Sequence, residues 1–190
     1  MIVMKPNSKM LHRSDKDLML MVIERNHQAF KVLYQRYEIS IYNFILRYIG
    51  NRELSQDLLQ ETFTRIWCAA HSFNAAKGNF KGWLFTIALN IIRSEMSKKR
   101  YGYTYLDINE ISGSERKLVQ PTHEQPDKKV EHLELEDKIQ QALLKLQPFL
   151  REVIILNHFQ QLKFREIAQI TNTPVGTLKS RFHRAVGLLK

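Results

Sequence analysis

Apolar residues recur at helical spacing along most of the chain, and this feature limits the possible folds more than any other. The clearest stripe runs from Phe30 to Tyr48 in steps of three and four residues, and Gly50, a common helix terminator, follows it. The sequence lacks the apolar-polar alternation of strands, and it has only 7 glycines and 5 prolines in 190 residues. We therefore predict an all-α protein.

Further helices are expected on both sides of this stripe. Ser14 and Asp17 have the spacing of a capping box and predict the start of a short helix. Apolar periodicity places helices at about residues 15–24, 53–71 and 80–100. With the long stripe, these segments predict an N-terminal helical bundle.

The C-terminal end has the pattern of a helix-turn-helix. Apolar residues repeat at helical spacing in residues 164–171 and again in residues 174–190. Asn172 lies where the first helix needs a left-handed residue, which asparagine tolerates well. Thr173 is then expected to cap a second helix whose first residue is Pro174.

The second of these helices is expected to present a basic face. Leu178 and Phe182 belong to its apolar stripe and should pack in the core. The other face carries Thr177, Lys179, Ser180, Arg181 and Arg184. No acidic residue occurs from Pro174 to the end of the chain. Such a face suits phosphates and base edges of duplex DNA.

Helical periodicity is lost in the middle of the chain, where glycine, serine and proline mix with charged residues. This change predicts a linker between two domains. We place the domains at residues 1–102 and 131–190 and the linker at residues 103–130. The expected fold is thus two small helical domains joined by a flexible linker, with the helix-turn-helix in the C-terminal one.

The charge of the chain favours a polyanionic partner. The formal net charge is +10 and the isoelectric point is near 9.7, so nucleic acid is the first candidate. No segment approaches the roughly 20 apolar residues needed to span a bilayer, and the N-terminus lacks a signal-peptide core. We therefore expect a cytoplasmic protein.

Patterns of catalysis and metal binding are missing from the sequence. The 7 histidines are scattered, and neither an HExxH nor a GxSxG motif nor a phosphate-binding glycine-rich loop occurs. The single cysteine, Cys68, excludes an internal disulfide, and we expect it to be a small core or boundary residue. The sequence thus predicts no enzyme, no cofactor, no metal and no small-molecule substrate.

Five sequence strings in this order resemble one known family. They are AFKVLYQRY (29–37), DLLQETFTRIW (57–67), FKGWLFTIALNIIRSEMSKKR (80–100), LREVIILNHF (150–159) and FREIAQITNTPVGTLKSRFHRA (164–185). The chain resembles bacterial RNA polymerase sigma factors of the extracytoplasmic-function (ECF) group of the sigma-70 family, which keep only conserved regions 2 and 4. The resemblance covers nearly the whole chain.

The resemblance implies a function for each domain. Residues 1–102 would be region 2, which binds core RNA polymerase and the minus-10 element, and residues 131–190 would be region 4, which binds the minus-35 element. The implied polymerase contacts are Asp57, Gln60, Glu61 and Phe63. The implied contacts to the melted minus-10 strand are Phe73, Ile87, Asn90, Arg93, Lys98, Lys99 and Arg100. The implied minus-35 contacts are Thr173, Thr177, Lys179, Ser180, Arg181 and Arg184.

The expected partners are therefore core RNA polymerase and promoter DNA. Members of this family are usually inhibited by an anti-sigma factor, which is often anchored in the membrane, so the resemblance also implies such a partner and a possible location at the inner membrane. An alternative is a helix-turn-helix regulator that binds operators as a dimer. It would explain the C-terminal domain but would leave residues 57–67 and the basic helix before the linker without a role.

Overall fold

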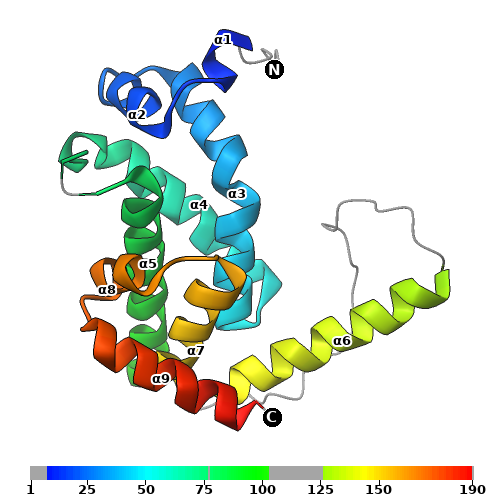
Figure 1. The fold of residues 1–190 in the computed structure, drawn as a ribbon. Coiled ribbons are helices and arrows are strands. Elements are labelled where there is room, and N and C mark those ends of the chain that lie inside the picture. The colour runs from blue at the N-terminus through cyan, green and yellow to red at the C-terminus, as the bar shows by residue number, and fades with distance from the viewer. Residues whose placement is uncertain (1–7, 77, 103–125, 190) are drawn as a thin grey trace.

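The computed structural model describes residues 8–76, 78–102 and 126–189, and within these ranges it contains helices and no strands (Figure 1). The N-terminal unit consists of α1 (Ser8–Leu11), α2 (Asp15–Ile23), α3 (His27–Ile49), α4 (Arg52–Cys68), the short 3₁₀ helix η1 (Ala70–Ser72) and α5 (Phe80–Gly102). The C-terminal unit consists of α6 (Pro126–Lys145), α7 (Pro148–Ile154), the π-helical turn η3 (Ile155–Phe159), α8 (Phe164–Thr171) and α9 (Val175–Leu188). The prediction of an all-α fold is confirmed.

Helix α3 is the central helix of the N-terminal unit, and both of its ends follow from the sequence. At its start, the Asn26 side chain accepts hydrogen bonds from the N–H groups of Gln28 and Ala29, both at 3.0 Å. At its end, Gly50 adopts the left-handed conformation with φ of 79°. A Cβ atom on Gly50 would stand only 2.7 Å from a methyl carbon of Leu144 in α6. Gly50 therefore ends the helix and also lets the C-terminal unit approach it.

Helix α4 is shorter than the predicted 53–71, because the α-helix ends at Cys68 and the chain continues into η1. Leu58 and Ile66 are buried, and α4 packs against both α3 and α5. Cys68 is two residues beyond Ile66, so it points away from the buried side of the helix, and it is exposed. The expectation that Cys68 is a core or boundary residue was wrong.

The C-terminal unit begins earlier than expected. Helix α6 starts at Pro126, a residue that favours the first turn of a helix, so the end of the expected linker is helical. Residues 103–125 of that linker lie outside the described residues. The corner between α6 and α7 is held by the buried Arg151, which donates to the carbonyls of Leu143 at 2.8 Å and Leu146 at 3.0 Å. These bonds satisfy carbonyls that the end of α6 leaves open.

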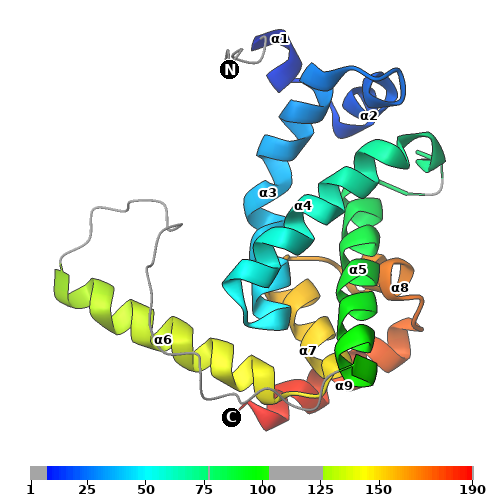
Figure 2. The same cartoon turned by 180° about the vertical axis from the view of Figure 1, so that it is seen from behind.

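The two units pack directly against each other. Helix α8 lies against α5, and η3 and the C-terminal half of α6 lie against α3, as both ribbon views show (Figures 1 and 2). The N-terminal half of α6 extends away from the body of the molecule (Figure 2). Buried apolar residues of the two units form one continuous cluster.

Candidate nucleic-acid interface

Local sequence fixes the geometry of the helix-turn-helix. The Glu166 carboxylate accepts a hydrogen bond from the Lys163 N–H at 2.8 Å and so completes the start of α8. Asn172 ends α8 in the left-handed conformation, with φ of 52° and ψ of 45°. Both the limits of α8 and the role of Asn172 agree with the prediction from sequence.

The predicted cap of α9 was wrong. Pro174 is extended, with ψ of 141°, and occupies the capping position, so the helix begins one residue later, at Val175. Thr173 is therefore outside the helix, and its hydroxyl donates to the carbonyl of Thr171 at 3.3 Å. The proline provides no side-chain cap, and the first N–H groups of α9 are left without one.

Helix α9 is held by its apolar stripe. Leu178 and Ala185 are fully buried, and α9 packs on both α7 and α8. Phe182 is half-buried and meets the ring of Phe164 edge-to-face, with the ring centres 5.7 Å apart. The predicted core positions Leu178 and Phe182 thus both contribute to packing, which fixes the orientation of the opposite face.

That opposite face is exposed and basic. Thr177, Lys179, Ser180 and Arg184 are all exposed. Arg181 differs from them, because its guanidinium carbon lies 5.1 Å from the centre of the Phe149 ring and the residue is half-buried. The structure therefore leaves four of the predicted α9 residues free to meet DNA and holds the fifth partly against α7.

The three residues predicted to enclose an extruded base differ in how far they are exposed. Phe73 is 9% exposed and packs with the ring of Phe80 at 6.2 Å and that of Trp83 at 5.4 Å. Ile87 is half-buried against the core, and Asn90, one turn further along α5, is exposed. Asn90 is thus the accessible member of this set, whereas Phe73 belongs to an aromatic cluster.

The basic end of α5 meets different partners. Lys98 is exposed, with its ammonium nitrogen 3.5 Å from a carboxylate oxygen of Glu95. The side chains of Lys99 and Arg100 lie outside the described residues. Arg93 is directed toward the C-terminal unit, where one guanidinium nitrogen donates to both carboxylate oxygens of Glu152, at 2.9 and 3.0 Å.

This ion pair belongs to a polar cluster between the units. The Glu152 side chain is 3% exposed, and its burial raises its pKa, while the positive charges of Arg93 and Arg181 lower it. Burial, together with the charge of Glu152, raises the pKa of the Tyr48 phenol to about 12. Arg151 donates to the Tyr48 carbonyl at 2.7 Å.

Our reading of the sequence missed Arg151 and Glu152. One signal was available: these two charged residues lie side by side within an otherwise apolar run from Leu150 to Leu156. Charged side chains at such positions are buried only when they have partners. The partners could not be identified, because they are on distant segments of the chain.

The acidic face of α4 contains three accessible polar residues and one buried aromatic one. Asp57 and Gln60 are exposed, and Glu61 pairs with Arg65 one turn along the helix. Phe63 is only 3% exposed, and its ring packs against Tyr34 and Phe30, with centre separations of 4.6 and 6.2 Å. In this structure Phe63 is therefore a packing residue of α4, and its contact with the polymerase stays a prediction.

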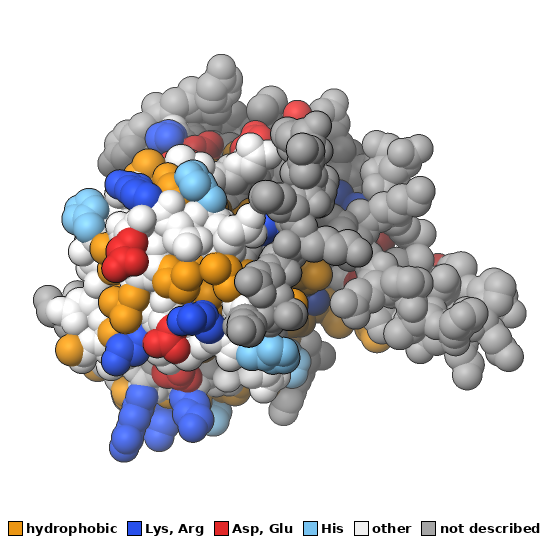
Figure 3. Space-filling model, turned by 90° about the horizontal axis from the view of Figure 1, so that it is seen from above, with side chains coloured by type: hydrophobic (Ala, Val, Ile, Leu, Met, Phe, Trp, Pro, Cys, Tyr) orange, Lys and Arg blue, Asp and Glu red, His pale blue; other side chains and the backbone are white. Residues whose placement is uncertain are grey.

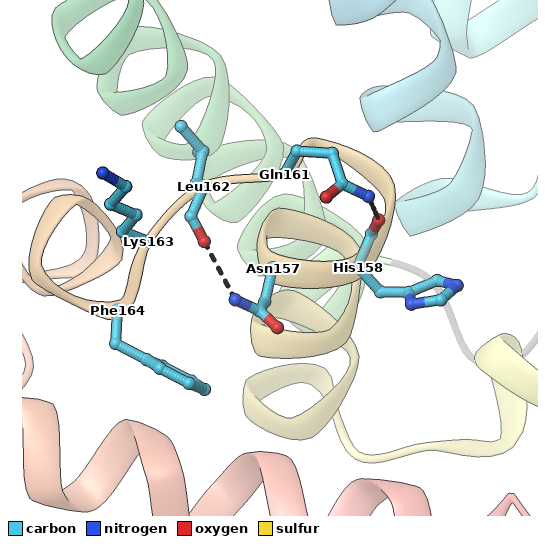
Figure 4. Close-up of a pocket in the computed structure, with 6 residues that line it drawn as sticks. All are labelled: Asn157, His158, Gln161, Leu162, Lys163 and Phe164. Carbon is cyan, nitrogen blue, oxygen red and sulfur yellow. Dashed lines mark hydrogen bonds between the residues drawn. The ribbon is translucent and has the colours of Figure 1, made fainter.

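An open hollow of about 420 Å³ separates η3 from α8 (Figure 4). The amides that line it bond to the backbone of the same turn: Asn157 donates to the Leu162 carbonyl at 2.9 Å and Gln161 to the His158 carbonyl at 2.6 Å (Figure 4). These bonds hold the chain segment that leads into α8. The hollow is thus a feature of the turn that positions the helix-turn-helix.

The face at the α1–α2 end mixes its charges. Basic, acidic and apolar side chains are interspersed over the part drawn in colour, with a group of Lys and Arg at one edge (Figure 3).

Within the described ranges, no three His, Cys, Asp or Glu side chains are grouped so as to hold a metal ion. In the same ranges, no helix is long and apolar enough to cross a membrane.

Comparison with known families decides between the classes of DNA-binding protein. Residues 33–101 match the family model described as Sigma-70 region 2, and residues 136–189 match the model described as Sigma-70, region 4. The ECF RNA polymerase sigma factor SigW of Bacillus subtilis is 33% identical over 187 residues, covering 96% of this chain and 92% of SigW. The chain belongs to the ECF sigma factors.

Other relatives agree with this assignment. SigM of Bacillus subtilis is 30% identical to this sigma factor, over 83% of the chain and 91% of SigM. A solved structure of the sigma factor RpoE with the anti-sigma factor NepR, from Bartonella quintana, is 28% identical and matches with a TM-score of 0.64 over 84% of this chain and 93% of RpoE. CnrH, solved with the cytosolic domain of CnrY, has the same fold at 23% identity, with a TM-score of 0.69 over 93% of this chain and 95% of CnrH.

Proposed function

We propose that this sigma factor binds core RNA polymerase and directs initiation at specific promoters through two DNA contacts. The C-terminal unit binds the minus-35 duplex, and the N-terminal unit binds the melted minus-10 strand. One observation carries the proposal: a helix-turn-helix with an acid-free, exposed face on α9 occurs in the same chain as a match to Sigma-70 region 2 over residues 33–101. We place region 2 in residues 1–102 and region 4 in residues 131–190, as expected from the sequence, with the first turn of α6 preceding region 4.

At the minus-35 element, α9 enters the major groove with Thr177, Lys179, Ser180 and Arg184 toward the DNA. The unpaired N–H groups at the start of α9 face a backbone phosphate. Arg181 contributes less than Lys179 or Arg184, because its guanidinium already lies over Phe149. Thr173 borders this site without capping the helix.

At the minus-10 element, the exposed amide of Asn90 bonds the polar edge of an extruded base, and Ile87 packs beside it. Phe73 stabilises the start of α5 beside this site, because its ring packs against those of Phe80 and Trp83. The backbone of the single strand is held by Lys98, Lys99, Arg100 and, when released from Glu152, Arg93.

The exposed acidic face of α4 binds the polymerase. The contact is formed by Asp57, Gln60 and Glu61, and its negative charge complements a basic surface on the polymerase.

We also propose that an anti-sigma factor binds this chain. The support is RpoE, which is 28% identical and whose structure was solved with NepR. In this scheme the polymerase performs all of the chemistry.

Transcription of a promoter library by purified core polymerase tests the proposal. Adding this chain alone should give transcripts from a defined subset of promoters. Variants then assign the activity to α9: Lys179→Ala with Arg184→Ala should abolish it, whereas Lys145→Ala, which changes another exposed lysine at the end of α6, should not. If the chain bound DNA but added no transcripts, an operator-binding regulator would be the better description.

A further inference from the structure

The buried side of α9 gives a reference direction for its exposed residues. Leu178 and Ala185 are both 0% exposed, and α9 packs on α7 and α8. The two residues lie about two helical turns apart, so their side chains leave the helix in nearly the same direction. The direction of every other side chain of α9 can therefore be measured from this pair.

A ridge of exposed residues lies opposite the buried side. Successive residues of an α-helix are rotated by about 100°, so a residue two positions from Leu178 or Ala185 is rotated by about 200° and lies nearly opposite. The exposed residues that meet this condition are Gly176, Ser180, His183 and Gly187. A Cβ atom on either glycine would meet nothing within 4 Å, so the fold does not require glycine there. Ser180 and His183 are the side chains that project from the ridge.

Two exposed cations lie on opposite sides of this ridge. Lys179 follows Leu178 by one residue, which rotates it by about 100° in one direction. Arg184 precedes Ala185 by one residue, which rotates it by about 100° in the other direction. A helix in the major groove has base edges beneath its centre and a phosphate backbone along each side. In this orientation the ridge faces the bases, and the two cations face the two backbones.

His183 has the side chain of the ridge that is best suited to read a base. Its ring packs edge-to-face with that of the neighbouring Phe182, with the ring centres 6.2 Å apart, which restricts the orientation of the imidazole. An imidazole N–H can donate to N7 of a purine in the major groove, and in guanine the O6 acceptor lies beside N7. The Ser180 hydroxyl can donate or accept and so discriminates less between bases.

We propose that His183 reads a purine of the minus-35 element and Ser180 a nearby base pair, while Lys179 and Arg184 hold the two phosphate backbones. The inference rests on the proposed function and adds His183 to its DNA contacts. Ser180 and His183 are separated by about 4.5 Å along the helix axis, and base pairs are stacked about 3.4 Å apart, so the two side chains meet base pairs that are neighbours or nearly so. The ridge selects the sequence, and the flanking cations supply affinity that does not depend on it.

A promoter library with randomised bases in the minus-35 region tests this division. Core polymerase with this chain transcribes the library, and the transcribed templates are sequenced. His183→Ala should lower the preference for a purine at one position by about fivefold or more, the usual effect of one lost base contact. Ser180→Ala should lower the preference one or two base pairs away. The control is His12→Ala, which changes an exposed histidine before α2 and should alter neither preference.

The salt dependence of binding to the preferred promoter gives a second readout. Lys179→Ala and Arg184→Ala should each lower the slope of log affinity against log salt by about one unit and leave the preferred bases unchanged. His183→Ala should leave the slope unchanged, because contact with a base edge releases no phosphate counterions. Since His183 is exposed, this variant should also unfold at the same urea concentration as the wild type.

The failures of the two proposals give different results. If the wild type shows no base preference upstream of the minus-10 element, the proposed minus-35 contact fails and the inference fails with it. If the wild type shows a preference that His183→Ala leaves intact, the proposed function stands and His183 does not read a base. If Lys179→Ala changes the preferred base, the division of α9 into ridge and flanks is wrong.

Discussion

At the scale of single residues, burial separates side chains that support the fold from those that are free to bind. Asp57 and Phe63 lie in one sequence string on the same helix, yet only Asp57 reaches solvent. Similarly, Arg181 and Arg184 are one turn apart on α9, and only Arg184 is exposed. A sequence string identifies the segment that binds a partner. It does not show which side chains of that segment are buried in the fold and which are exposed to the partner.

The first prediction separates these roles on α4. Phe63→Ala removes a ring packed between Tyr34 and Phe30 and should lower the free energy of unfolding by about 3–5 kcal/mol. Asp57→Ala should leave stability nearly unchanged while weakening the affinity for core polymerase. Urea unfolding and a polymerase-binding titration measure the two effects, with Glu24→Ala, an exposed acid just after the end of α2, as the control. A stable Phe63→Ala variant with weakened polymerase binding would confirm Phe63 as a contact residue.

The second prediction concerns Gly50. Its φ of 79° disfavours any side chain, and an added Cβ would meet Leu144 at 2.7 Å. Gly50→Ala should therefore lower the free energy of unfolding by roughly 1–2 kcal/mol or more. Combining it with Leu144→Ala should recover the part of this loss that comes from the clash, but not the part that comes from the left-handed backbone. The free energy lost in Leu144→Ala alone is subtracted first. If Gly50→Ala unfolded at the same urea concentration as the wild type, the left-handed assignment would be wrong.

The third prediction concerns the pH dependence of stability. Burial raises the pKa of Glu152 in the folded chain above its usual value, against the opposing charges of Arg93 and Arg181. The folded state therefore holds this proton more tightly than the unfolded state, and the resulting stability is present at acidic pH and lost as pH rises through the raised pKa. Relative to Glu152→Gln, the wild type should gain stability as pH falls from neutral toward pH 5 or so.

Urea unfolding of both proteins across this pH range gives the difference curve directly. The Gln variant has nearly the same shape without the titrating group, so effects of other carboxylates cancel. A wild type that loses stability relative to Glu152→Gln as pH falls would indicate a lowered pKa, dominated by Arg93.

At the scale of elements, the sequence predicted the helices well because their signals are local. The limits of α8, the left-handed Asn172 and the end of α3 at Gly50 were all read correctly from residue types. The errors also have local causes. Pro174, and not Thr173, occupies the capping position of α9. The end of α4 was placed too late because Ala69 and Ala70 continue the apolar composition beyond the end of the helix at Cys68.

The fourth prediction concerns α9 as an element. Lys179→Ala and Arg184→Ala should each lower the slope of log affinity against log salt by about one unit for minus-35 duplex DNA. Arg181→Ala should change the slope less, because this residue is shielded by Phe149. Binding titrations at several salt concentrations measure all three slopes. Equal slopes for the three variants would mean that the Arg181–Phe149 contact does not persist on DNA.

At the scale of the whole molecule, the arrangement of the two units was beyond the reach of the sequence. The pairs that join them, Ser40 with Gln160 and Arg93 with Glu152, are separated by 120 and 59 positions along the chain. Nothing in the sequence indicates which distant residue each of these side chains meets. The sequence predicts two DNA-binding units, and only the structure shows that in the packed chain one of them covers part of the other.

The central claim is a promoter contact at two points, and strand opening measures it most directly. Core polymerase with this chain on a responsive promoter should protect the minus-35 duplex and make the minus-10 thymines reactive to permanganate. Asn90→Ala should lose the permanganate reactivity and keep the minus-35 protection, whereas Lys179→Ala with Arg184→Ala should lose both. If the Asn90→Ala variant opened the minus-10 strand as fully as the wild type, or if the wild type opened no strand at all, the account would be contradicted.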